Sequence, residues 1–243
     1  MKKDVKITIV VIAFCLMIFS FAGCNNGQQS VSVPEKPNVQ RTTLLYQGKA
    51  SIRIITIEGK VIYIDPYAGD GYDLAADLIL VTHGHFDHND VAKVKNRNTD
   101  CRTITHNEAV VNGEHKTFSF DFVTVKSVEA GFNAYHDVNN CVGYVLTFSD
   151  GKSVYVTGDT STTNQMSEMS KMEIDYAFYC CDGVYNMGFD EAAECAAKVN
   201  AKHNIPYHMT ATVNEGSFNR SLAERFNAPN RLIVAFGETI TIE

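Results

Sequence analysis

Four metal-binding side chains occur within a short stretch of this sequence, directly after an apolar run. Residues 78–81 are Leu-Ile-Leu-Val, which is typical of a buried strand, and His83, His85, Asp87 and His88 follow. Imidazole and carboxylate donors suit zinc, and also manganese or iron. Alternate residues at a strand end point the same way, so His83 and His85 can share one ion, with Asp87 and His88 directed toward a second. The alternative is a histidine-rich polar surface loop.

Other predicted strands also end on polar residues. Two β-rich runs, 52–57 and 61–64, predict a hairpin that ends at Asp65. A second hairpin, 142–148 and 153–157, ends at Gly158-Asp159, and a short strand ends at His208. Further strands are expected at 102–105, 118–128, 175–179, 232–236 and 239–242, and helices at 91–94, at 190–197 with Asp190 as its cap, and at 219–226.

The string THGHFDH at 82–88 resembles the HxHxDH motif of the metallo-β-lactamase fold superfamily. This resemblance implies a later histidine that completes the first metal site, an aspartate that bridges both ions, and a final histidine that completes the second site. His136, Asp159 and His208 occur in that order. The implied cofactor is therefore two divalent metal ions, with zinc expected first and manganese or iron as alternatives. The implied metal ligands are His83, His85, Asp87, His88, His136, Asp159 and His208.

Landmarks beyond the metal motif resemble a small single-domain branch that includes ascorbate-6-phosphate lactonase-like proteins. They include the spacing of His136 from Gly143-Tyr144-Val145 and the segments 183–187 and 205–208. The resemblance covers about residues 43 to 243 and implies a single α/β domain, a four-layer αββα sandwich. Departures at Cys180-Cys181-Asp182, at Asn186 and at Asp137 leave the substrate open.

Three further residues receive roles from the same resemblance. Asp65 is expected to orient a ligand histidine, although it could simply end a strand before Pro66. Tyr185 and Asn186 are assigned to the substrate pocket, while a place in the apolar core remains an equal alternative for Tyr185.

The expected chemistry is hydrolysis by a hydroxide held between the two ions. Two adjacent cations lower the pKa of bound water toward about 7 and stabilise a developing oxyanion. Asp159 would bridge the ions and Asp87 would shuttle a proton, so both are the expected catalytic residues. Lactone, ester, amide and phosphodiester bonds all fit. The alternative is a catalytically silent, metal-binding envelope lipoprotein.

The N-terminus has the pattern of an export signal. Lys2, Lys3 and Lys6 precede an apolar run over residues 7–19, and Phe21-Ala22-Gly23-Cys24 follows it. This resembles the lipobox of bacterial lipoproteins, which predicts a signal peptide over 1–23, a lipid anchor at Cys24, a flexible tether over 24–42 and a hydrolase domain over 43–243. An uncleaved membrane-spanning anchor is the alternative. In both cases the domain lies outside the cytoplasm and is attached to a membrane.

Charge and cysteine content limit the partners. Acidic residues outnumber basic ones by 28 to 21, which argues against nucleic acid and leaves a small-molecule or lipid-like substrate. The oligomeric state is not decided. Five cysteines would remain in the mature domain, and they are expected to be mainly small buried side chains, with one disulfide left open. These are Cys101, Cys141, Cys180, Cys181 and Cys195.

Overall fold

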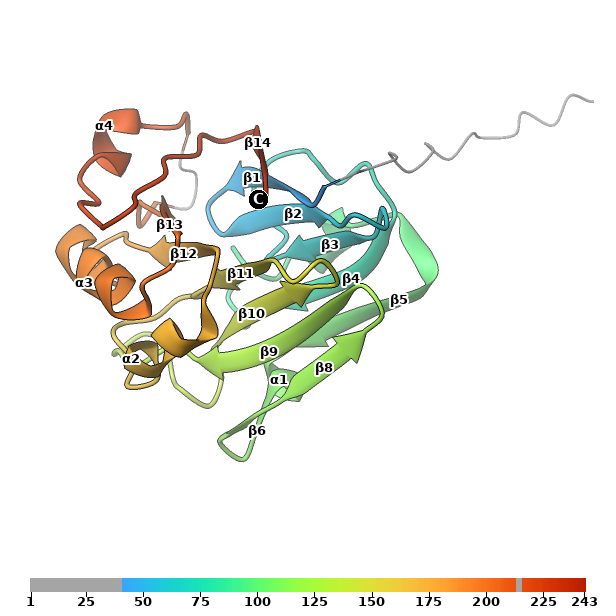
Figure 1. Ribbon diagram of the computed structural model, residues 1–243, viewed down its shortest axis with the longest axis horizontal. Coiled ribbons are helices and arrows are strands. Elements are labelled where there is room, and N and C mark those ends of the chain that lie inside the picture. The colour runs from blue at the N-terminus through green and yellow to red at the C-terminus, as the bar shows by residue number, and fades with distance from the viewer. Residues whose placement is uncertain (1–40, 213–215) are drawn as a thin grey trace, which may run out of the picture. The chain divides into compact units, whose positions relative to one another are not determined.

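The computed structural model describes residues 41–212 and 216–243, all within one compact unit that spans residues 36–243 (Figure 1). The predicted signal peptide, the Cys24 anchor and most of the tether lie outside the described residues. In the described part of the chain, no helix has the length and apolar character needed to cross a membrane.

Two six-stranded sheets pack face to face and share the same plan. The first sheet has the order β14 (Glu238–Thr241), β1 (Thr43–Gly48), β2 (Ser51–Ile55), β3 (Val61–Ile64), β4 (Ala76–Val81) and β5 (Arg97–Thr105). The second has the order β13 (His203–Tyr207), β12 (Tyr176–Cys180), β11 (Ser153–Val156), β10 (Val142–Phe148), β9 (Val123–Glu129) and β8 (Thr117–Phe120). A small hairpin, β6 (Val110–Val111) and β7 (Glu114–His115), follows α1 (His106–Ala109).

Each sheet combines an antiparallel part with a parallel part. Strands from β14 to β3 are antiparallel to their neighbours, whereas β3, β4 and β5 run parallel. In the second sheet, β8 to β11 are antiparallel and β11, β12 and β13 run parallel. The parallel strands of both sheets therefore present several carboxyl ends, where bound groups are usually found in such sheets.

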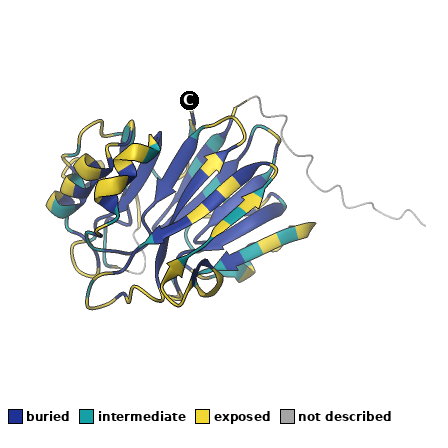
Figure 2. Cartoon of the chain, turned by 60° about the horizontal axis from the view of Figure 1, so that its bottom comes forward, coloured by how far each residue is buried: buried dark blue, intermediate teal, exposed yellow. Residues whose placement is uncertain are grey.

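The apolar core explains why these segments form strands. β3 and β4 are buried at every position, as expected for parallel strands covered on both faces, while β9 alternates buried and exposed residues (Figure 2). The main cluster fills the space between the sheets and continues under α3 (Phe189–Val199). The predicted sandwich is thus confirmed.

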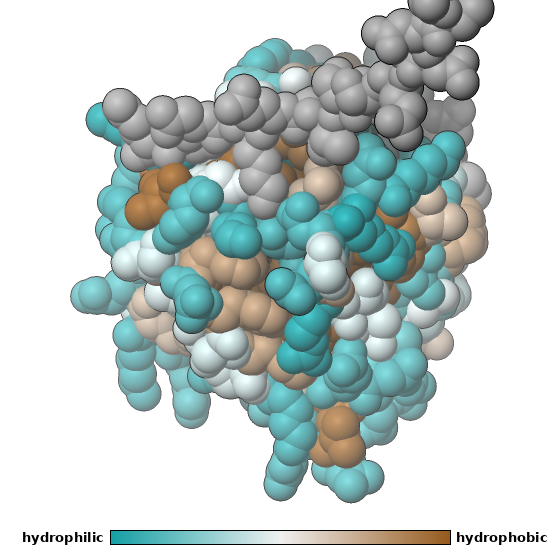
Figure 3. All heavy atoms as spheres, turned by 90° about the vertical axis from the view of Figure 1, so that its right-hand side faces the viewer, coloured by the Kyte–Doolittle hydropathy of each residue, from teal (hydrophilic) through white to brown (hydrophobic). Residues whose placement is uncertain are grey.

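The helical layers are thin. Among the described residues, α3 is the one helix longer than four residues; the others are α1, α2 (Met166–Met169), α4 (Arg220–Ala223) and two 3₁₀ turns, η1 (Val91–Lys93) and η2 (Ser170–Met172). The outer face of the first sheet is covered instead by Tyr72, Leu74 and Val94. On the face seen from the right-hand side of Figure 1, hydrophilic side chains surround a central apolar area (Figure 3).

Some predicted elements needed correction. Segment 118–128 is the β8–β9 hairpin rather than one strand, because the chain turns at 121–122 and pairs Phe120 with Val123. Residues 232–236 form no strand: the Leu232 amide donates to the Asn204 carbonyl oxygen, but the isolated β-bridge here joins Asn204 to Arg231, just before the predicted segment. Helix α3 begins at Phe189 after Gly188, so Asp190 lies in its first turn instead of capping it. The acidic first turn still suits the helix dipole.

Candidate metal centre

The candidate ligands meet at one end of the sandwich because the parallel strands end there. Asp65 follows β3, His83 follows β4, Asp159 follows β11 and His208 follows β13. β10 is antiparallel to β11, so the segment before β10, which contains His136, reaches the same end. The topology thus gathers residues separated by more than a hundred positions in the chain.

Three groups of three candidate ligands are formed: two share no residue, and a third, His83, His88 and Asp159, takes one histidine from each of them. Within each group the candidate atoms lie no more than 4.8 Å from one another. The first group is His83, His85 and His136, and the second is Asp87, His88 and His208. These are the two sets implied by the sequence.

Asp159 lies between the two groups. Its Oδ2 is 3.4 Å from His136 Nε2 and 3.6 Å from His208 Nε2, and its Oδ1 is 3.4 Å from His88 Nε2. The preceding Gly158 has a φ of 64°, and a Cβ there would lie 2.6 Å from the carbonyl oxygen of Val142. Only glycine fits this approach, so Gly158 sets the position of the carboxylate.

Several atoms that could bind a metal ion at this centre are buried without a hydrogen-bond partner. They are the Nε2 atoms of His83, His88 and His208 and the Oδ1 atom of Asp159. A buried polar atom without a partner costs about 1–3 kcal/mol, so native folds seldom leave several together. Nitrogen and carboxylate donors converging in this way fit divalent metal ions.

Acceptor groups lie next to the Nδ1 atoms of two candidate ligand histidines, His88 and His136. Asp65 Oδ2 lies 2.8 Å from His88 Nδ1, and the same carboxylate accepts hydrogen bonds of 2.7 Å from the Thr82 amide and hydroxyl. Asn133 Oδ1 lies 3.2 Å from His136 Nδ1. Contacts of this kind set the tautomer and the ring orientation of a metal ligand.

Asp182 lies behind another candidate ligand, at ion-pair distance and without a hydrogen bond to it, and the sequence did not reveal this. Its Oδ2 lies 3.4 Å from His208 Nδ1, and its side chain is fully buried. Its Oδ1 accepts hydrogen bonds of 2.7 Å from the amides of Val184 and Tyr185. The Cys180-Cys181-Asp182 departure therefore places a carboxylate behind a candidate ligand, a role with no signal in local spacing.

Lys49 is a second residue that sequence reasoning missed. Its ammonium group lies 3.6 Å from Asp87 Oδ2 and donates hydrogen bonds of 3.0 Å to the carbonyl oxygens of Thr210 and Thr212. Its side chain is only 2% exposed, although it lies in the turn between β1 and β2. β2 is antiparallel to β3, which brings this turn to the same end as Asp65.

Unusual backbone conformations cluster here. Asp65 has a φ of 45°, His208 a φ of 46° and Lys49 a φ of 51°. Left-handed conformations of residues other than glycine cost of order 1–3 kcal/mol and concentrate at functional sites. The His208 amide also donates to the Lys49 carbonyl oxygen at 3.1 Å, so two of these positions support each other.

Charge keeps both catalytic candidates ionised. Burial alone would raise the pKa of Asp159, but His208 and His88 hold it well below its usual range. Burial likewise opposes ionisation of Asp87, and the hydrogen bond from His208 together with the charges of His88 and Lys49 lowers its pKa. The pKa of His88 is raised despite burial, because Asp159 and Asp65 lie on either side of it.

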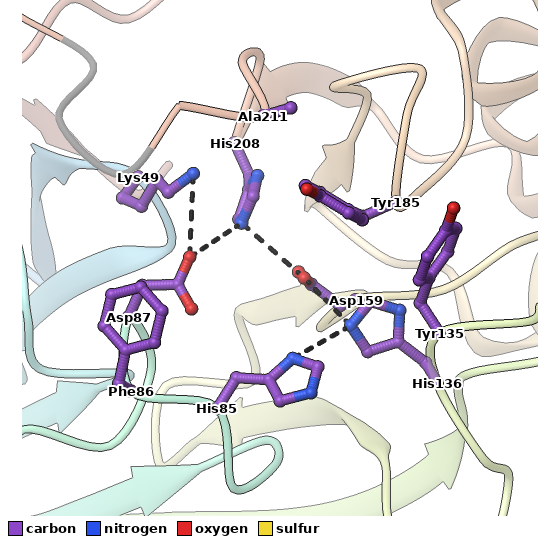
Figure 4. Close-up of a pocket in the computed structure, with 10 residues that line it drawn as sticks. All are labelled: Lys49, His85, Phe86, Asp87, Tyr135, His136, Asp159, Tyr185, His208 and Ala211. Atoms are coloured by element: carbon purple, nitrogen blue, oxygen red, sulfur yellow. Dashed lines mark hydrogen bonds and ion pairs between the residues drawn. The ribbon is translucent and has the colours of Figure 1, made fainter.

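A cavity of 310 Å³ opens above these residues (Figure 4). Its lining includes Asp87, Asp159 and His208 as well as Tyr185, which lies at the cavity and not in the apolar core. Asn186 is not part of the lining. Its amide group donates to Asp182 Oδ2 at 2.7 Å, so it supports the loop rather than facing a ligand.

The five cysteines of the described chain are all free thiols. Cys141, Cys180, Cys181 and Cys195 are buried and Cys101 is partly exposed. The disulfide left open by the sequence is not formed.

Comparison with known proteins agrees with this centre. The Beta-lactamase superfamily domain matches residues 43–208, which include all seven candidate ligands. A UPF0173 metal-dependent hydrolase from Anoxybacillus flavithermus is 31% identical over 192 residues, which cover 68% of this chain and 84% of the relative. The chain belongs to the UPF0173 family of metal-dependent hydrolases. The metallo-β-lactamase fold predicted for it is that of the wider superfamily.

Two solved structures of other proteins have a fold similar to that of this UPF0173 chain. A protein from Parabacteroides distasonis described as a metal-dependent hydrolase is 26% identical, with a TM-score of 0.65, and the match covers 79% of this chain and 92% of that one. A metallo hydrolase from Ignicoccus hospitalis is 20% identical, with a TM-score of 0.66 over 83% of this chain and 98% of that one. The second similarity is one of fold alone.

Proposed function

We propose that this metal-dependent hydrolase is dinuclear. One ion would be held by His83, His85 and His136 and the other by Asp87, His88 and His208. The observation that carries the proposal is the position of Asp159, whose carboxylate lies 3.4 Å from His136 Nε2 and 3.6 Å from His208 Nε2, one ligand from each group. Zinc is the proposed metal, and manganese and iron are the alternatives because they accept the same donors.

Two such ions would supply a water of lowered pKa and would polarise the bond to be cleaved. The protein's own residues do the rest. Asp87 lines the cavity, so its carboxylate would lie where it could accept a proton from the attacking water. Asp65 holds His88 in a fixed orientation through its 2.8 Å contact, and Asp182 lies 3.4 Å behind His208. The bond cleaved is proposed to be a lactone, ester, amide or phosphodiester bond.

Metal content and hydrolysis should be measured together. Elemental mass spectrometry of the purified protein is expected to find about two ions per chain, by analogy with two-metal hydrolases. Asp159→Ala should lower both the metal content and any activity on lactone, ester, amide and phosphodiester substrates. Asp190→Ala, which changes an exposed aspartate of α3, is the matched control and should alter neither.

Two results would contradict the proposal. Fewer than one ion per chain after reloading, with no activity on any substrate, would favour the catalytically silent, metal-binding lipoprotein. One ion per chain with full activity would reject the dinuclear arrangement alone.

We also propose that the protein is exported and attached to a bacterial membrane through lipid on Cys24. The support is the sequence of the first 24 residues, with its lysines, its apolar run and Ala22-Gly23 before the cysteine. Cys24→Ala should move the protein out of the membrane fraction or leave its precursor unprocessed. Unchanged fractionation and mass would refute the anchor.

A further inference from the structure

Exposed apolar side chains gather around the cavity. Seven large hydrophobic residues are exposed in the described chain, and six of them lie in three loops at this end of the sandwich. Those six are Phe86, Phe132, Tyr135, Val138, Val184 and Tyr185, and the seventh is Val111 in β6. Apolar surface that concentrates at one place on a protein commonly marks a binding site.

Three of these residues form the rim of the cavity itself. Phe86 is 62% exposed, Tyr135 56% and Tyr185 43%, and all three line it. Figure 4 shows Phe86 on one side of the ligand cluster and Tyr135 with Tyr185 on the other. A group bound at the metal ligands would therefore lie close to aromatic side chains on two sides.

The rim residues are held in place by specific contacts. The rings of Tyr135 and Tyr185 meet edge to face with centroids 5.0 Å apart, and Phe86 meets Tyr67 in the same way at 5.9 Å. The Tyr185 amide is bound to Asp182, the residue behind His208. The aromatic surface is thus tied to the metal-binding residues, and little side-chain entropy would be lost when a ligand binds.

The charge of the cavity limits what it can accept. Of the described residues that line it, Lys49 alone carries a permanent positive charge, and its ammonium group already donates to two carbonyl oxygens. No arginine is available there for a bidentate contact with a phosphate group. This composition would leave the binding of a phosphate group to the metal ions, because the side chains of the lining offer little for it.

We propose that Phe86, Tyr135 and Tyr185 bind the apolar part of the substrate, an aryl or short alkyl group next to the bond that is cleaved. The inference rests on the proposed function for the position of that bond. The cavity of 310 Å³ suits a small ligand of this kind. The substrate class is a molecule with one apolar arm next to the bond that is cleaved, rather than a wholly polar metabolite.

Alkyl hydroxamates test the rim without requiring turnover, because the hydroxamate group binds metal and the alkyl chain reports on its surroundings. Isothermal titration calorimetry on the metal-loaded protein would compare acetohydroxamate with hexanohydroxamate. Hexanohydroxamate has four more methylenes, and each one that is buried should raise affinity by about threefold, which gives about 80-fold when all four are buried. Tyr185→Ala and Phe86→Ala should weaken hexanohydroxamate binding by about tenfold and acetohydroxamate binding by less than about twofold.

Controls separate the rim from general effects. Val111→Ala changes an exposed apolar residue outside the cavity and should leave both affinities unchanged. Tyr185→Phe keeps the ring and should bind hexanohydroxamate nearly as well as the unaltered protein. Variants are compared only at equal metal content, so that a lost ion is not mistaken for a lost apolar contact.

Equal affinity for the two hydroxamates, or failure of both to bind, would overturn the inference. A rim that contacts a membrane instead of the substrate would also give one of these results. Chain-length-dependent binding without hydrolysis of any test substrate would support the apolar rim and contradict the proposed bond classes. Hydrolysis of a test substrate without a chain-length preference would support the proposed bond classes and contradict the apolar rim.

Discussion

Asp182 Oδ2 lies 3.4 Å from His208 Nδ1, so a fully buried carboxylate supports the last candidate ligand in the chain. The same carboxylate holds the amide of Tyr185 at the rim of the cavity. One side chain therefore links the metal centre to the proposed substrate surface.

Asp182→Asn is expected to weaken metal binding. The asparagine side chain has one acceptor oxygen, so it cannot face both His208 and the loop amides as the carboxylate does. Loss of a contact behind a metal ligand typically lowers metal affinity by about 10-fold to 100-fold, and we expect a loss of that size here. Competition with a chromophoric chelator would measure it. Asp190→Asn, on the exposed face of α3, is the control, and equal affinities in both variants would show that the contact is incidental.

Lys49→Met should destabilise the fold. The change removes a donor from the Thr210 and Thr212 carbonyl oxygens and the positive charge beside Asp87, a loss of about 2–4 kcal/mol in the free energy of unfolding. Urea unfolding followed by circular dichroism would measure it, since the chain has no tryptophan. Lys116→Met breaks only the exposed pair with Glu114 and should cost less than about 0.5 kcal/mol. Similar losses in both variants would contradict the role given to Lys49.

Gly158→Ala should prevent normal folding near Asp159. A Cβ would lie 2.6 Å from the Val142 carbonyl oxygen in addition to the strain of a φ of 64°, and we expect a loss of more than about 3 kcal/mol. Gly151→Ala provides the comparison. Its φ of 81° imposes similar strain, but nothing lies within 4 Å, so about 1 kcal/mol is expected. Thermal melting of both variants would reveal the difference, and equal shifts would reject the close approach as the cause.

Metal removal should lower thermal stability. An ion at a free concentration of 100 times its Kd stabilises the folded state by about 2.7 kcal/mol per site, or roughly 5–10 °C in Tm for a domain of this size. Melting with and without a chelator would test this, and Asp159→Ala should show a smaller shift. Identical melting curves of the unaltered protein with and without the chelator would mean that metal binding does not contribute to the stability of the fold.

Thiol reactivity should follow burial. Burial raises the pKa of Cys141 to about 12, so its thiol is protonated at pH 8 and becomes nucleophilic only as the pH approaches that value. Iodoacetamide labelling with peptide mass spectrometry should modify Cys101 in the native protein, and the four buried thiols only after unfolding. Rapid native labelling of Cys180 or Cys181 would contradict the packing described here.

The sequence predicted strands and candidate metal ligands where a pattern of neighbouring residues marks them. Apolar runs placed β3 and β10 at their observed bounds, and the motif at 82–88 with the resemblance built on it identified the groups that converge in space. The sequence did not predict that Lys49 and Asp182 lie beside candidate metal ligands. Their partners, Asp87 and His208, are distant from them in the chain, and local pattern does not report such contacts. The strand predicted at 232–236 failed for a related reason: β-propensity cannot show whether a partner strand is present.

The candidate ligands come from both sheets: His83, His85, Asp87 and His88 follow β4 of the first, whereas His136, Asp159 and His208 border strands of the second. An ion shared through Asp159 would act as a removable cross-link between the two halves of the sandwich. A chain nicked in the exposed turn at Asn112-Gly113 would lose this cross-link once a chelator is added. The apolar core and hydrogen bonds such as those between β1 and β14 would still join its halves, which should separate at a lower denaturant concentration than with metal present.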